Sequence, residues 1–235
     1  MGDHSNKPPA THGSTQSGPI DAFLDKARSV SASQLRGRLI FALDATMSRQ
    51  PTWDMAQSIQ GEMFRATAAQ GGLDVQLVYF RGFGECRASR FVSGGEGLGA
   101  LMARISCRGG RTQIGKVLRH ALDESRAGRV GALVYVGDAM EEPIESLAAA
   151  AGELGLLGVK AFMFQEGHDP TTQHAFREVA RLTGGAYAAF DAAAPRRLAD
   201  LLAAAAAYAV GGRLELERRA SEGGAAARLL LSQIG

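Results

Sequence analysis

The stretch that decides the fold is Leu39-Ile40-Phe41-Ala42-Leu43-Asp44-Ala45-Thr46-Met47-Ser48. The apolar run over residues 39–43 predicts a strand buried on both faces, which is typical of parallel sheets covered by helices. The strand ends in Asp44, and Asp44, Thr46 and Ser48 then alternate along the following loop. The stretch therefore predicts a core strand that delivers three oxygen-bearing side chains at its carboxyl end.

Outward from this strand, apolar runs of strand length alternate with segments of helical periodicity. The alternation indicates βαβ units and an α/β fold with a mostly parallel, six-stranded sheet and helices on both faces. Strands are predicted over 39–43, 73–80, 86–92, 130–136, 159–164 and 186–190, and 86–92 is expected to be an antiparallel edge. Helices are predicted over 55–66, 98–105, 114–122, 144–155, 172–182 and 195–210.

The ends of the chain differ in composition from this central part. Residues 1–19 have no large apolar side chain after Met1, so a disordered tail is expected. Residues 20–36 have apolar positions at helical spacing and predict a leading helix. The core domain is then expected over 37–210, followed by an extension over 211–235 that contains a Gly-Gly break and a final helical pattern.

Composition narrows the class of protein. The 235 residues are 46% hydrophobic and 21% charged, which suits one substantial core, and the net charge of +2 points to no class of partner. The two cysteines, Cys86 and Cys107, cannot form a disulfide framework or complete a four-ligand zinc site. No signal-peptide core and no run of about 18 apolar residues occurs. A cytoplasmic location without membrane contact is therefore expected.

Two further oxygen donors follow predicted elements at the same edge of the sheet. Asp138 ends the strand predicted over 130–136, and Thr112 opens a helix after Gly109 and Gly110. Ligands of open α/β sheets bind outside the carboxyl ends of the strands, near the point where the strand order reverses. Asp44, Thr46, Ser48, Thr112 and Asp138 are therefore the candidate site.

The pattern Asp44-x-Thr46-x-Ser48, then Thr112, then Asp138 resembles the metal-ion-dependent adhesion site of von Willebrand factor A domains. The resemblance covers about residues 37–210 and implies a doubly wound sheet. It implies that Ser48, Thr112 and Thr46 bind Mg²⁺ or Mn²⁺ directly and that Asp44 and Asp138 act through water. It also implies that an Asp or Glu of a protein partner completes the metal shell, in an adaptor or assembly role.

Elementary chemistry agrees with this expectation. Mg²⁺ prefers hard oxygen ligands, and a site with few direct charges stays attractive to an incoming carboxylate. Two departures from the family pattern are visible: Thr46 replaces the usual Ser, and Ala139-Met140 follows Asp138 where Gly is usual. The first keeps the hydroxyl, whereas the second alters the shape of the loop.

Other motifs suggest other functions. Residues 110–116 have the glycine and lysine spacing of a phosphate-binding loop, but Val117 stands where that loop needs Ser or Thr. A metal-dependent phosphoester enzyme would use Glu141 or Glu142 as its base, but ligands for only one metal are visible. Because the sequence shows no paired nucleophile and base, a non-enzymatic role is predicted.

The segment 81–119 is rich in Arg and Lys and provides a third alternative, a nucleic-acid-binding module. Its basic residues are Arg81, Arg87, Arg90, Arg104, Arg108, Arg111, Lys116 and Arg119. Arg108 and Arg111 flank the predicted metal loop, so they are candidate contacts to a partner, as is Glu141. Trp53, the only Trp, is either a core anchor or an exposed partner contact.

Overall fold

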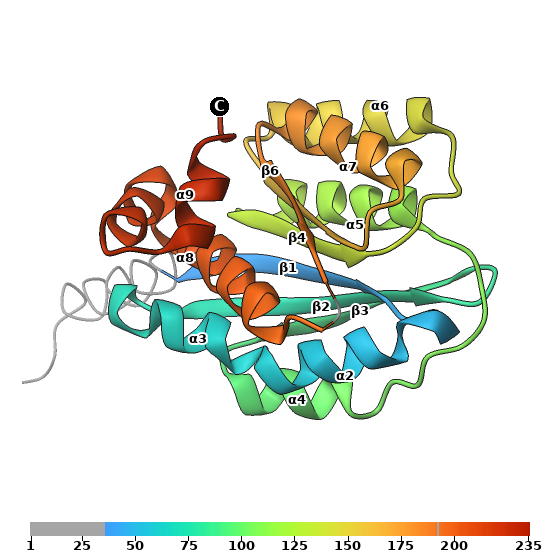
Figure 1. Cartoon of the computed structure of the whole chain (residues 1–235), viewed down its shortest axis with the longest axis horizontal. Helices are drawn as coiled ribbons and strands as arrows, with labels where there is room; N and C mark the ends of the chain where they lie inside the picture. Colours follow the sequence, from blue (N-terminus) through green and yellow to red (C-terminus); the bar gives the residue numbers. More distant parts are fainter. Residues whose placement is uncertain (1–35, 192) are drawn as a thin grey trace, which may run out of the picture. The chain divides into compact units, whose positions relative to one another are not determined.

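The computed structural model describes residues 36–191 and 193–235 (Figure 1). The tail predicted over 1–19 and nearly all of the helix predicted over 20–36 lie outside the described residues. The described strands form one six-stranded sheet in the order β3-β2-β1-β4-β5-β6. They are β1 (Gly37–Asp44), β2 (Leu73–Arg81), β3 (Glu85–Val92), β4 (Ala132–Gly137), β5 (Lys160–Glu166) and β6 (Ala186–Phe190).

Neighbouring strands are parallel except at one edge, where β3 runs antiparallel to β2. This confirms the predicted mixed sheet with a single antiparallel edge strand. The register pairs Asp44 of β1 with Phe80 of β2, and Leu43 of β1 with Val136 of β4. The carboxyl ends of β1, β2 and β4 therefore lie at one edge of the sheet.

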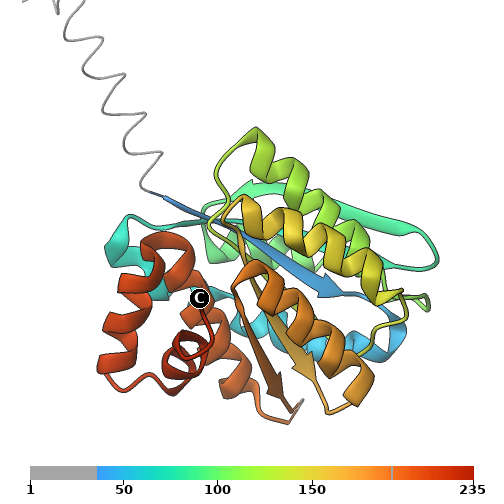
Figure 2. The ribbon, with the colours of Figure 1, turned by 90° about the horizontal axis from the view of Figure 1, so that it is seen from above.

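Helices cover both faces of the sheet (Figures 1 and 2). The α-helices are α2 (Gln50–Ile59), α3 (Gly61–Thr67), α4 (Gly95–Met102), α5 (Ile114–Ala127), α6 (Ile144–Leu156), α7 (Pro170–Thr183), α8 (Pro195–Ser221) and α9 (Ala225–Leu231), with 3-10 turns η1 (Met47–Arg49) and η2 (Ala68–Gln70). Helices α5, α6 and α7 lie side by side on one face, and α2, α3, α4 and α8 cover the other. None of the helices in the described ranges is long and apolar enough to cross a membrane.

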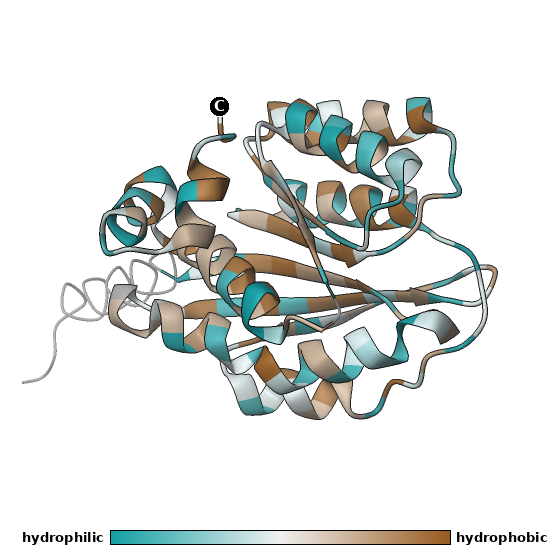
Figure 3. Cartoon of the chain, viewed as in Figure 1, coloured by the Kyte–Doolittle hydropathy of each residue, from teal (hydrophilic) through white to brown (hydrophobic). Residues whose placement is uncertain are grey.

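The central strand β1 divides the core into two layers. Its residues Leu39, Phe41 and Leu43 pack into one apolar cluster, and Ile40 and Ala42 pack into the cluster on the opposite face. Successive side chains of a strand point to opposite faces, so a strand covered on both sides must be apolar throughout. Figure 3 shows this pattern as brown strands between helices that have one brown and one teal side.

The segment α8 (Pro195–Ser221) joins two helices across a break at Gly212, so the first of them ends close to the bound predicted at residue 210. Helix α8 continues to Ser221, although Gly212 adopts φ 64° and ψ −152° and interrupts the regular helix. Beyond this break, Leu216 of α8 and Leu230 of α9 are both 0% exposed and belong to the same cluster as Leu39. The C-terminal segment therefore packs into the core on the α8 face of the sheet.

A single side chain of this C-terminal segment binds the edge strand β6. The side-chain carbonyl of Gln233 accepts a hydrogen bond from the backbone N–H of Tyr187 at 3.0 Å. The side-chain amide of Gln233 donates to the backbone carbonyl of Tyr187, also at 3.0 Å. Gln233 thus occupies both backbone hydrogen-bonding groups of one residue on this edge.

Candidate metal site

The candidate site lies where the sheet changes its direction of winding. From β1 the chain passes through α2 and α3 on one face, and from β4 it passes through α6 on the other. Strands β1 and β4 are neighbours, and such a switch point leaves a crevice at their carboxyl ends. Asp44 is the last residue of β1, and Asp138 directly follows the last residue of β4.

Asp44 is a buried carboxylate with few partners. It is 3% exposed, and its Oδ1 accepts a hydrogen bond from the backbone N–H of Thr46 at 2.7 Å. Burial, which is the largest cause, and the negative charge of Asp138 together raise the pKa of Asp44 to about 6. Hydrogen bonds from Thr46 and the charge of Arg49 act in the opposite direction without cancelling the burial effect. The carboxylate therefore lies in surroundings that supply too little positive charge.

Two hydroxyl donors follow Asp44 in the chain. Thr46 is 9% exposed and immediately precedes the turn η1, and its carbonyl accepts from the N–H of Arg49 at 3.0 Å. Ser48 lies within η1, is exposed, and makes no side-chain hydrogen bond to another described residue. The tight turn thus keeps both hydroxyls beside the carboxyl end of β1.

The loop that carries Thr112 is joined to the same edge by backbone contacts. The N–H of Arg108 donates to the carbonyl of Ala45 at 3.0 Å, and the N–H of Arg111 donates to the carbonyl of Gly82 at 3.1 Å. A Cβ atom at Gly110 would lie 2.2 Å from that carbonyl oxygen, so only glycine permits this approach. Thr112 is 7% exposed and follows directly.

The loop after β4 is bound to the start of α5 by two carboxylates. Glu141 accepts a hydrogen bond from the N–H of Thr112 at 3.0 Å, and the hydroxyl of Thr112 accepts one from the N–H of Glu141 at 3.0 Å. Glu142 accepts from the N–H groups of Ile114 and Gly115. These carboxylates satisfy backbone donors that a helix N-terminus leaves free. The loop of Asp138 and the loop of Thr112 are therefore held together.

The structure also places a buried arginine at this edge, which the sequence analysis missed. Arg49 is 2% exposed; its Nη1 lies 3.3 Å from Oδ2 of Asp138, and its Nη2 forms an ion pair with Glu166. Glu166, the last residue of β5, also accepts a hydrogen bond from the hydroxyl of Thr52. Arginine is rarely buried, so the sequence offered no reason to expect this side chain in the site. The available signal was Glu166, a third carboxylate after a predicted core strand.

The donors fit a divalent cation. Asp44, Asp138 and Glu166 bring three carboxylates to the surroundings of one guanidinium, that of Arg49, so negative charge is in excess. Two buried polar atoms here, the hydroxyl of Tyr135 and Nε of Arg49, have no hydrogen-bond partner among the described residues. Such atoms are normally satisfied by water or ions. A hydrated cation held by hard oxygen atoms would balance the charge and bring water to these atoms.

The hydroxyl groups are essential to any such site. No group of three or more His, Cys, Asp or Glu side chains in the described ranges is arranged to hold a metal ion. The guanidinium of Arg49 separates Asp138 from Glu166, because it pairs with both. A metal here would therefore depend on Thr46, Ser48 and Thr112 in addition to the two aspartates.

Trp53 is a core anchor, and the interpretation as a partner contact is wrong. Its side chain is 1% exposed, its Nε1 donates to the carbonyl of Met102 at 3.3 Å, and its ring meets Tyr79 edge to face. A side chain with no exposed surface cannot contact a partner. Arg108, Arg111 and Glu141 are exposed beside the site, and their role as partner contacts stays a prediction.

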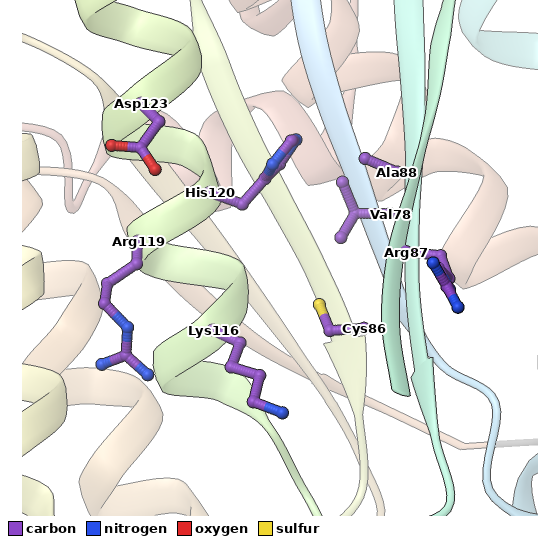
Figure 4. Close-up of a pocket in the computed structure, with 8 residues that line it drawn as sticks. All are labelled: Val78, Cys86, Arg87, Ala88, Lys116, Arg119, His120 and Asp123. Atoms are coloured by element: carbon purple, nitrogen blue, oxygen red, sulfur yellow. The ribbon is translucent and has the colours of Figure 1, made fainter. Parts of the chain in front are cut away.

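A basic groove lies elsewhere on the domain, between β3 and α5 (Figure 4). It is lined by Val78, Cys86, Arg87, Ala88, Lys116, Arg119, His120 and Asp123. Lys116 donates to the carbonyl of Gly84 and to the side chain of Gln113, and His120 pairs with Gln76. Arg87, Lys116 and Arg119 are the exposed cations of this groove, and the two arginines lie on opposite sides of Cys86 in Figure 4. Lys116 lies inside α5, as the sequence indicated, and not in a phosphate-binding loop.

The fold is an α/β fold of the von Willebrand A type. No protein-family model and no curated protein sequence matches the chain. Among solved structures it is similar to the SpRpn10 VWA domain, with 12% identity, a TM-score of 0.54, and coverage of 69% of this chain and 95% of that one.

Two further structures are comparably similar. An aerotolerance-related membrane protein from Bacteroides fragilis, solved with multiple mutations to serines, has 18% identity and a TM-score of 0.52, with coverage of 68% of this chain and 95% of that one. The human COPII-coat protein Sec24c has 11% identity and a TM-score of 0.53, with coverage of 73% of this chain but 32% of that one. At these identities the likeness shows the fold alone.

Proposed function

We propose that this chain is a protein-binding domain that engages an Asp or Glu of its partner through Mg²⁺ or Mn²⁺. The observation that carries the proposal is the convergence of Asp44, Asp138 and the Thr112 loop at the switch point of the sheet, around an excess of buried negative charge. The similarity to a VWA domain, at 12% identity, supports a fold of the kind that carries such sites. Metal dependence itself is part of the proposal.

In this proposal, the chain's own residues arrange the oxygen donors. Thr46, Ser48 and Thr112 present hydroxyls, and Asp44 and Asp138 hold the surrounding water. The hydrogen bond from the N–H of Thr46 to Asp44 fixes the loop after β1. The paired hydrogen bonds between Thr112 and Glu141 hold the loop before α5 against the loop after β4. A bound divalent cation would supply the electrophilic centre that attracts a carboxylate.

We infer a binding role and not catalysis. The thiol of Cys107 is a candidate nucleophile that feels the negative charge of Asp44. Burial, together with that charge, raises the pKa of this thiol to about 11. A thiol held in its protonated form is a poor nucleophile.

The unpaired cysteines Cys86 and Cys107 support the proposal of a cytoplasmic, reducing location.

The phosphoester alternative loses its candidate base. Glu141 accepts a hydrogen bond from the N–H of Thr112, and Glu142 accepts from two N–H groups of α5. Carboxylates that cap a helix in this way are engaged in stabilising it. Both carboxylates are therefore bound to backbone N–H groups, which leaves them less available to accept a proton from a substrate.

The metal claim is tested by calorimetric titration of Mg²⁺ and Mn²⁺. The wild-type chain and Ser58→Ala, which removes an exposed hydroxyl from the neighbouring helix α2, are expected to give the same binding heats. Ser48→Ala and Thr112→Ala are expected to weaken binding by about tenfold or more, because each removes a direct ligand. Equal heats in all four proteins would contradict the proposal.

The partner claim is tested by affinity capture with and without chelator. The main captured protein should be lost when EDTA is present and regained when Mn²⁺ is restored. Ser48→Ala should lose the same protein, and Ser58→Ala should retain it. If the captured proteins are unchanged by EDTA and by Ser48→Ala, the binding does not pass through a metal.

The basic groove favours one second candidate function, binding to a nucleic-acid backbone. Arg87, Lys116 and Arg119 are its exposed cations, and phosphate contacts of this kind depend strongly on salt. Fluorescence anisotropy with single-stranded DNA and RNA of mixed sequence measures this. Binding that falls with salt, survives Asp44→Ala and is lost in the double variant Arg87→Gln and Arg119→Gln would support the second candidate over the first.

A further inference from the structure

The buried guanidinium of Arg49 has two partners that differ in how firmly they hold it. Glu166 pairs with Nη2 and is itself held by the hydroxyl of Thr52, so this pair is anchored from both sides. Asp138 lies 3.3 Å from Nη1 and is 31% exposed, whereas the side chain of Glu166 is 18% exposed. The contact to Asp138 is therefore the looser and more accessible of the two.

Arg49 cannot leave this edge without a large cost. A buried charge that loses its partners is strongly destabilising, and Arg49 is 2% exposed with an unpartnered Nε. The Glu166 pair satisfies this requirement alone, because a carboxylate neutralises one guanidinium. Arg49 can therefore release Asp138 while remaining in place.

Asp138 is also one of the two carboxylates that the proposed metal site requires. Its Oδ2 is the atom that contacts Arg49, so the same carboxylate faces two candidate cations. A guanidinium at this distance both occupies the carboxylate and repels an approaching divalent cation. The arrangement places a cation of the chain itself in competition with a cation from solution.

We propose that Arg49 and a divalent cation compete for Asp138, and that Glu166 sets the outcome by holding Arg49 back. Asp138 passes from the guanidinium to the metal shell when the cation binds, and Arg49 then relies on Glu166. The competition lowers metal affinity below that of the oxygen donors alone. This inference rests on the proposed metal site and concerns residues that the site's sequence pattern does not include.

The test is a double-mutant cycle of Arg49→Gln and Glu166→Gln, with Mn²⁺ binding measured by calorimetry. Arg49→Gln should bind Mn²⁺ about tenfold more tightly than wild type, because the competing charge is gone. Glu166→Gln should bind more weakly, because Arg49 then depends on Asp138 alone. In the double variant the effect of Glu166→Gln should nearly vanish, since it acts through Arg49. Arg65→Gln, which removes an exposed arginine paired with Glu62, is the control and should match wild type.

The outcomes separate this inference from the proposed function. The competition is overturned if the wild type binds Mn²⁺ and Arg49→Gln binds it equally or more weakly. It is also overturned if the effects of the two substitutions simply add. Neither result contradicts the proposed metal site. No binding by any variant would overturn both. Binding by Arg49→Gln but not by wild type would support the competition and contradict metal dependence of the natural chain.

Folding of the variants is followed by circular dichroism and thermal unfolding. If Arg49→Gln does not fold, Glu166→Gln and Arg49→Lys replace it in the comparison. Lysine keeps the charge but has a single ammonium group that cannot pair with two carboxylates as the planar guanidinium does. Competition predicts that Arg49→Lys binds Mn²⁺ more tightly than Glu166→Gln, and the reverse order would overturn it.

Discussion

At the residue scale, Asp44 shows how a functional site can cost stability. Its pKa in the folded protein, about 6, lies above its ordinary value of 3.8, because burial disfavours the charged form. The folded state therefore binds this proton more tightly than the unfolded state does. The cost of the charge is fully present above pH 6 and disappears as the pH falls towards 4.

Asp44→Asn is therefore expected to stabilise the protein in the presence of EDTA. An amide oxygen can still accept the hydrogen bond from Thr46, so the gain at pH 8 should be about 3 kcal/mol and should vanish near pH 4. Urea unfolding at several pH values measures the difference. Asp54→Asn, at an exposed position of α2, should change stability by less than about 0.5 kcal/mol. A destabilised Asp44→Asn at pH 8 would refute this account of Asp44.

Sequence reasoning correctly located residues whose position in the fold depends on a short segment. Asp44, Thr46 and Asp138 follow buried strands, and the order of strands in an α/β sheet brings such positions to one edge. Arg49 was missed because its burial depends on Glu166, which is 117 positions away in the chain. Trp53 was left open because periodicity could not show that α4 would cover it.

At the scale of elements, the N-terminus of helix α5 is capped by a side chain from another loop, the one that follows β4. Its N-cap residue Gln113 makes no capping hydrogen bond of its own. The carboxylate of Glu142 accepts from the N–H of Gly115 at 3.0 Å and from that of Ile114. The start of α5 and the loop after β4 therefore form one unit, and a change in either alters the surroundings of Asp138.

Glu142→Ala is expected to lower the free energy of unfolding by about 1 to 2 kcal/mol, because two N–H groups lose their acceptor. Chemical denaturation followed by circular dichroism measures the loss. Glu145→Ala, at an exposed site in the first turn of α6, serves as the control and should stay within about 0.5 kcal/mol. Equal stability of the two variants would show that the cap contributes nothing.

The strands were predicted more accurately than the helices. Buried runs such as 130–136 are marked by continuous apolar residues, and β4 (Ala132–Gly137) lies within two residues of this range. The helix predicted over 55–66 is instead two helices, α2 and α3, that meet at Gln60. The side-chain amide of Gln60 donates to the carbonyl of Gly95, a contact that periodicity within one segment cannot reveal.

At the scale of the whole molecule, the segment after Gly212 completes the core on one face of the sheet. Leu216 is 0% exposed, whereas Leu214, two positions earlier in the same helix, is 78% exposed. The sequence pattern predicted a helix over 195–210, and Gly212, just beyond it, does leave helical geometry. The packing beyond it depends on contacts of α8 with α9 and with the distant helix α3, which no local pattern encodes.

Leu216→Ala is expected to destabilise the protein by about 2 to 4 kcal/mol, because it leaves a cavity in a closely packed cluster. Leu214→Ala removes the same atoms from an exposed position and should change stability by less than about 0.5 kcal/mol. Thermal unfolding of the two variants gives the comparison. Similar melting temperatures would mean that the C-terminal segment is not part of the cooperative core.

The two hydrogen bonds from Gln233 to Tyr187 also bear on self-association. An uncovered outer strand offers a row of free N–H and C=O groups on which a second chain can add a strand. Gln233 fills one such position on β6, and α9 packs beside it. A variant truncated before Gln233 would leave both of these backbone groups free, and we expect it to associate through β6 more readily than the wild-type chain.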